Sequence, residues 1–118
     1  MPGASGCFAQ VSGLCFTYDF DGAAGSRVTG AVFQNPDGTC SATAVDPSAG
    51  TTYTLAENDF MSSGGDRYAA DIGSATTREF LDQVVTAYVT ANTPITPTIG
   101  GRIKCTASGA GICPTPLP

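Results

Sequence analysis

The stretch that decides the fold is Asn58-Asp59-Phe60-Met61-Ser62-Ser63-Gly64-Gly65-Asp66-Arg67-Tyr68. It follows an alternating segment over residues 52–57, which predicts a strand, and it precedes the strongest helical pattern in the chain. Gly64 and Gly65 allow positive φ angles and let a ligand approach the backbone closely. A loop that follows a strand and carries both an aromatic ring and a carboxylate is typical of a binding edge.

Each of two side chains in this stretch has two interpretations. Phe60 either stacks on the ring of a ligand or belongs to the hydrophobic core at the strand end. Asp66 either accepts hydrogen bonds from ligand hydroxyl groups or binds amides of its own turn. Asn58 and Asp59 are expected to shape the loop. The residues alone leave the choice between ligand binding and local structure open.

One main helix is expected over about residues 76–91. Thr76 is the predicted N-cap, and Glu79 three residues later would complete a capping box. Pro94 cannot continue the helix. Apolar side chains recur between these limits at helical spacing and predict one buried face, which consists of Phe80, Leu81, Val84, Val85 and Tyr88.

Short strand patterns separated by turn residues occupy most of the remaining chain. They cover residues 8–11, 14–18, 27–34, 39–44, 52–57 and 102–106. The turn Asn35-Pro36-Asp37-Gly38 predicts a hairpin. The expected class is therefore α+β, with a mixed sheet of several short strands and the main helix packed on it. A domain over residues 1–106 would be followed by a Gly/Pro-rich tail over residues 107–118.

The composition excludes several classes of protein. The chain has 118 residues, of which 42% are hydrophobic and 13% charged, as expected for one globular domain rather than a disordered chain. A net charge of −5 argues against binding to nucleic acid. No apolar run approaches the ~20 residues of a membrane span. The start at Met1 has no signal-peptide pattern and favours a truncated chain.

Five cysteines in so short a chain predict an oxidising location, namely extracellular, periplasmic or at the cell surface. Cys105 and Cys113 are the favoured disulfide pair, because glycines between them allow a turn. Cys15 with Cys40 is an alternative that needs two neighbouring strands in the right register. The odd count leaves at least one thiol unpaired or bonded between chains. With no histidine and no Cys-x-x-Cys pair, a structural zinc site is not expected.

Five blocks of sequence in this order carry a family resemblance. The blocks are Phe8-Ala9-Gln10-Val11-Ser12-Gly13, Phe16-Thr17-Tyr18-Asp19, Gly25-Ser26-Arg27-Val28, the opening stretch from Asn58 to Tyr68, and Gly101-Arg102-Ile103. Together they resemble the C-terminal domain of the 5′-nucleotidase family, which includes UDP-sugar hydrolases and 2′,3′-cyclic-nucleotide phosphodiesterases. The resemblance implies that the domain recognises a nucleoside or nucleotide. Its substrate-binding residues would be Asn58, Phe60, Gly64, Gly65 and Asp66, with Phe60 on the base and Asp66 on the ribose.

The resemblance also implies that catalysis belongs to another domain. In the family, a metallophosphoesterase domain with divalent metal ions lies upstream, as do the second stacking ring and the phosphate-binding arginines. This chain has no histidine and its acids are scattered, so it is expected to hold no cofactor and to be inactive alone. At Arg67 the family usually has glycine, and a side chain there restricts positive φ.

Two further expectations follow from the absent upstream part. An unpaired strand edge and the odd cysteine favour a homodimer of the chain. An alternative function, from a different class, is a secreted, disulfide-braced interaction or structural domain that has lost nucleotide binding.

Overall fold

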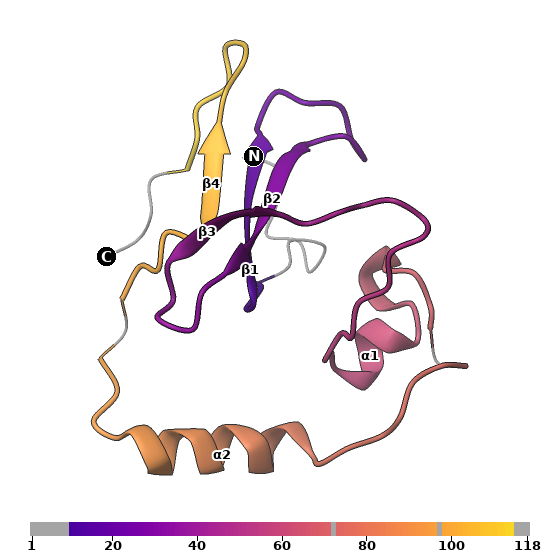
Figure 1. The fold of residues 1–118 in the computed structure, drawn as a ribbon, viewed down its shortest axis with the longest axis vertical. Coiled ribbons are helices and arrows are strands. Elements are labelled where there is room, and N and C mark those ends of the chain that lie inside the picture. Colours follow the sequence, from indigo (N-terminus) through magenta and orange to yellow (C-terminus); the bar gives the residue numbers. More distant parts are fainter. Residues whose placement is uncertain (1–9, 72, 97, 115–118) are drawn as a thin grey trace. The chain divides into compact units, whose positions relative to one another are not determined.

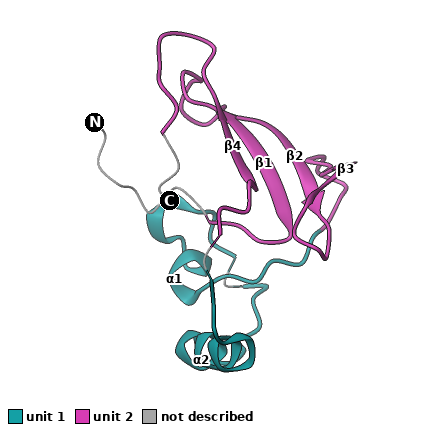
Figure 2. Cartoon of the chain, turned by 90° about the vertical axis from the view of Figure 1, so that its left-hand side faces the viewer, with its two compact units in different colours: residues 1–9, 53–97 teal, residues 10–52, 98–118 magenta. Residues whose placement is uncertain are grey.

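The computed structural model describes residues 10–71, 73–96 and 98–114, and the chain divides into two compact units (Figure 2). The first unit comprises residues 1–9 and 53–97, and the second comprises residues 10–52 and 98–118. Part of the expected strand over residues 8–11 lies outside the described residues, and its described part, Gln10 and Val11, is not a strand. Residues 115–118 of the expected tail also lie outside them.

The second unit is a mixed four-stranded sheet (Figure 1). Its strands are β1 (Leu14–Asp19), β2 (Val28–Gln34), β3 (Cys40–Ala44) and β4 (Ile103–Thr106). Their order across the sheet is β3-β2-β1-β4. β1 pairs with β2 in antiparallel register and with β4 in parallel register, so the expected mixed sheet is confirmed.

The hairpin between β2 and β3 forms at the predicted turn. The amide of Gly38 donates to the carbonyl of Asn35 over 2.9 Å, and Gly38 has a φ of 87°, which glycine adopts without strain. The amide of Asn35 in turn donates to the carbonyl of Thr39 over 2.8 Å. The register between β2 and β3 then shifts between Val32 and Gln34.

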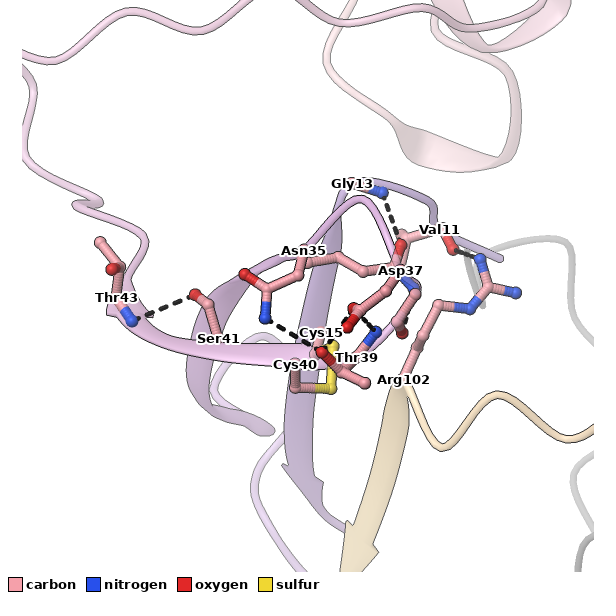
Figure 3. Close-up of a disulfide and its surroundings, with 12 residues drawn as sticks. Val11, Gly13, Cys15, Asn35, Asp37, Thr39, Cys40, Ser41, Thr43 and Arg102 are labelled. Carbon is pink, nitrogen blue, oxygen red and sulfur yellow. Dashed lines mark hydrogen bonds between the residues drawn. A yellow bond between two sulfur atoms is a disulfide. The ribbon is translucent and has the colours of Figure 1, made fainter.

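A disulfide joins the two strands that flank β2 (Figure 3). Cys15 on β1 bonds Cys40 on β3, and their Cα atoms are 5.9 Å apart although β2 lies between these strands in the sheet order. The expected Cys15–Cys40 disulfide is therefore present, although the two cysteines do not lie on neighbouring strands. Cys15 is 5% exposed, and it is the one hydrophobic residue that is buried among the residues that the structure describes. The hydrophobic core of the sheet is thus centred on a disulfide.

The second disulfide, Cys105–Cys113, closes a loop at the end of β4. This loop is fastened to the segment after β1. The amides of Gly109 and Gly111 donate to the Asp21 carboxylate over 2.8 and 2.9 Å. The hydroxyl and amide of Ser108 donate to Asp19 and hold the pKa of its carboxyl below the ordinary value. Residues 108–113 are therefore anchored to the sheet unit.

The first unit contains two short helices and one long one. These are α1 (Asp59–Ser62), the 3-10 turn η1 (Gly65–Arg67) and α2 (Leu81–Asn92). The one main helix confirms the α+β class. The predicted strand over residues 52–57 is wrong, because those residues join no strand of the described chain. An alternating pattern forms a strand only where a partner supplies the hydrogen bonds of the ladder.

α2 begins at Leu81, so the predicted start at Thr76 is wrong. Phe80 occupies the N-cap position, and no side chain caps the helix. The amides of Gln83 and Val84 donate to the carbonyl of Phe80, each over 3.1 Å. Thr76 lies four residues before this N-cap position, so the Thr76–Glu79 capping box does not form in the structure.

The apolar face predicted for this helix is exposed in the structure. Its side chains range from 47% exposed at Val84 to 75% exposed at Phe80, and α2 buries no residue. Packing of this face against the sheet therefore stays a prediction. Among the described residues, no helix combines the length and apolarity needed to cross a membrane.

Candidate functional site

The candidate site is built on α1 and η1, which follow one another in the first unit. Asn58 takes an extended conformation, and its side-chain oxygen accepts the amide of Met61 over 2.8 Å. This is an N-cap contact, which satisfies a free amide at the start of α1. The Asp59 carboxylate accepts the amide of Phe60 over 3.0 Å. Asn58 and Asp59 therefore shape the loop, as expected from the sequence.

Phe60 is placed by α1 against Gly65. A Cβ atom built on Gly65 would lie 2.5 Å from Cε1 and 2.6 Å from Cδ1 of the Phe60 ring. Only glycine leaves room for this contact. The ring remains 57% exposed, so Phe60 is not a core residue in the structure. An exposed ring held against a backbone presents apolar surface for a flat ligand.

Three residues that flank Gly65, one before it and two after it, have backbone angles in the left-handed region. Gly64 has a φ of 91°, and Asp66 and Arg67 have φ values of 52° and 70°. Asp tolerates this region because its short polar side chain can bond locally, whereas Arg has no such advantage. Asp66 is exposed at the turn. Arg67 thus adopts a positive φ at the position where the sequence resemblance leads one to expect glycine.

Replacing Arg67 with Gly is expected to stabilise the loop, because a left-handed conformation costs a non-glycine residue about 1–2 kcal/mol. The gain in the free energy of unfolding is expected to be about 0.5–1 kcal/mol, since glycine also loses more backbone entropy on folding. Urea denaturation of the two proteins would measure it. Arg78→Gly, at a position without positive φ in the structure, is the control and should not stabilise the protein.

The structure adds two residues that the sequence did not indicate, Ser62 and Asp71. The Ser62 hydroxyl donates to Asp71 Oδ1 over 2.7 Å, and the Asp71 amide donates to the Ser62 carbonyl over 3.0 Å. Ser62 is 8% exposed, and within the described part of the chain it is the one polar residue that is buried. No local spacing rule links a serine to an aspartate nine positions later, so the sequence carries no signal for this pair.

A further carboxyl group, Glu57, directly precedes Asn58. Partial burial, the charge of Asp71 and a hydrogen bond to Asp71 together raise the pKa of Glu57 above its ordinary value.

Metal ions have no evident ligands in this part of the molecule. Within residues 10–71, 73–96 and 98–114, no three His, Cys, Asp or Glu side chains gather in a group that could hold a metal ion. The site offers instead an exposed ring, a glycine contact and an exposed carboxylate. These groups can bind an organic ligand, but none is placed as a nucleophile beside a general base.

Comparison with known proteins places this loop in a family. The family described as 5′-nucleotidase, C-terminal domain, matches residues 2–71, which include the whole candidate site. The trifunctional nucleotide phosphoesterase protein YfkN of Bacillus subtilis (strain 168) is 29% identical over 107 residues, covering 84% of this chain. The chain spans only 7% of the length of that relative. No solved structure matches the chain. Because the family match covers more than half of its length, this chain belongs to the family of 5′-nucleotidase C-terminal domains.

Proposed function

We propose that this chain is the nucleoside-recognition part of a secreted, metal-dependent phosphohydrolase of the 5′-nucleotidase type. Phe60 stacks on the base, and Asp66 accepts hydrogen bonds from the ribose hydroxyls. A metallophosphoesterase domain elsewhere in a longer protein binds the divalent metal ions and hydrolyses the phosphate ester. The exposed Phe60 ring, held on Gly65 directly before Asp66, is the observation that carries this proposal.

Each element of the proposal has its own support. Aromatic rings bind bases of any sequence because every base has a flat π-face. A carboxylate forms short, charge-assisted hydrogen bonds with hydroxyl groups. The relative from Bacillus is named a nucleotide phosphoesterase, and the chain corresponds to a small part of it. Two disulfides, Cys15–Cys40 and Cys105–Cys113, support an oxidising compartment outside the cytosol.

The proposal is tested by titrating the chain with adenosine, AMP and UDP-glucose. The amide chemical shifts of residues 58–68 are followed during each titration. We expect saturable shifts at Phe60, Gly65 and Asp66, and comparable affinities for adenosine and AMP, because the loop is proposed to bind base and ribose. Absence of saturable shifts with all three ligands would contradict nucleoside binding by this chain.

One observation favours a second function, namely an interaction or structural domain that has lost nucleotide binding. Arg67 adopts a φ of 70° where the resemblance leads one to expect glycine, and a long charged side chain projects from the binding turn. If Arg67 blocks the site, Arg67→Gly restores ligand-induced shifts that the unmodified chain lacks. If neither protein responds to nucleosides, the interaction domain is the better description.

Activity of the chain alone is a separate prediction. Because the sequence has no histidine and its acids are scattered, we expect no release of phosphate from AMP with added Mg²⁺, Mn²⁺ or Zn²⁺. A colorimetric phosphate assay with the purified chain measures this. A metal-dependent turnover that survives repurification would show that the chain holds a catalytic site of its own.

A further inference from the structure

The loop that carries the proposed nucleoside site is closed at its base by Ser62 and Asp71. Ser62 ends α1, and Asp71 follows the segment that contains Gly64, Gly65, Asp66 and Arg67. Two hydrogen bonds in opposite directions join them, with lengths of 2.7 and 3.0 Å. Residues 63–70 therefore form a closed loop whose two ends are bonded to each other.

Asp71 is itself held from the other side. Its carbonyl accepts both the amide and the hydroxyl of Ser74, over 2.8 and 3.0 Å. The Ser62 hydroxyl is buried, so loss of its acceptor would leave a polar group without compensation. Both ends of the loop are thus fixed by specific contacts rather than by apolar packing. Movement of Asp71 would release the loop and the left-handed backbone of Asp66.

We propose that Ser62 and Asp71 are positioning residues, which hold the 63–70 loop and with it Asp66 in the binding conformation. The proposal rests on the proposed function of the loop, and it deepens that function by naming the contact that orders the site.

The test measures amide hydrogen-exchange protection of residues 63–70 at one fixed pH in the unmodified chain and in its variants. Ser62→Ala and Asp71→Ala should lower protection about three- to tenfold, as expected for the loss of one or two hydrogen bonds. Asp71→Asn keeps the acceptor for Ser62 and should restore most of the protection. Thr90→Ala is the control, since its hydroxyl bonds the Thr86 carbonyl within α2.

Rescue by the conservative variant distinguishes positioning through the hydrogen bond from a general structural role. Asp71→Asn keeps an acceptor oxygen, so it should restore most of the protection that Asp71→Ala loses. Equal protection in Ser62→Ala, Asp71→Ala and the unmodified chain would overturn the proposal, and so would equal losses in Asp71→Asn and Asp71→Ala.

Adenosine binding by the same variants separates the two proposals. If the unmodified chain binds adenosine, Ser62→Ala should weaken the affinity by about the factor lost in protection. If the unmodified chain binds no nucleoside but its loop responds as described, the proposed function fails and the positioning role of Ser62 and Asp71 stands. If adenosine binds with equal affinity to Ser62→Ala, Asp71→Ala and the unmodified chain, the positioning role fails and the proposed function stands.

Discussion

Replacing Phe60 with Ala is expected to weaken adenosine binding by about 5- to 150-fold, because stacking of a base on an aromatic ring contributes about 1–3 kcal/mol. The ring is 57% exposed and is held against Gly65, so its removal should change the ligand surface without opening a core cavity. Isothermal titration calorimetry of the two proteins measures the difference. Phe80→Ala is a matched control, since Phe80 is a 75% exposed phenylalanine of the same unit at the N-cap of α2.

Gly65→Ala provides a second route to the same site. An alanine Cβ would lie 2.5 Å from the Phe60 ring, so the ring must move. The substitution should therefore weaken adenosine binding while every group proposed to touch the ligand is retained. Unchanged affinity in Phe60→Ala would show that the ring does not stack on the base. Unchanged affinity in Gly65→Ala alone would show that the ring tolerates displacement.

The parts of the fold that were predicted correctly have local chemical causes. The hairpin at Asn35-Pro36-Asp37-Gly38 needs a positive φ at one position, and the sequence supplies glycine there. The expectation that Asn58 shapes its loop likewise depends on residues within three positions of it, since its side chain accepts the amide of Met61. Such features are determined by short spacings that can be recognised without knowledge of the rest of the molecule.

The parts that were missed depend on distant or competing contacts. Residues 52–57 alternate like a strand but do not join the sheet, because a strand exists only through its partner. α2 starts at Leu81 rather than at Thr76, because its first hydrogen bonds go to the Phe80 carbonyl and the capping pattern upstream is not used. Ser62 and Asp71 are nine residues apart and meet only because left-handed residues turn the loop back on α1. The sequence indicated Phe60 and Asp66 as candidate binding residues but carried no signal for the contact between Ser62 and Asp71.

The largest loss of stability is expected on removal of the Cys15–Cys40 disulfide. It closes a loop with a sequence separation of 25, for which the loss of chain entropy corresponds to about 3.5 kcal/mol. The Cys105–Cys113 disulfide has a separation of 8, which corresponds to about 2.5 kcal/mol. Stabilities of whole domains are only about 5–15 kcal/mol. Because the buried hydrophobic residue of the described chain is Cys15 itself, little apolar burial remains to compensate for the lost bond.

Urea denaturation of double-alanine variants would test this order. Alanine is preferred to serine at Cys15 because a buried hydroxyl without a partner adds a cost unrelated to the disulfide. Cys7 is replaced by Ser in every protein compared, so that its thiol cannot exchange with the remaining disulfide. Cys15→Ala/Cys40→Ala should lose more stability than Cys105→Ala/Cys113→Ala, whose loop keeps the contacts of Gly109 and Gly111 with Asp21. If both variants denature at the same urea concentration as the oxidised parent, the disulfides do not stabilise the sheet. If Cys105→Ala/Cys113→Ala loses more stability than Cys15→Ala/Cys40→Ala, the more important disulfide is the one in the loop after β4.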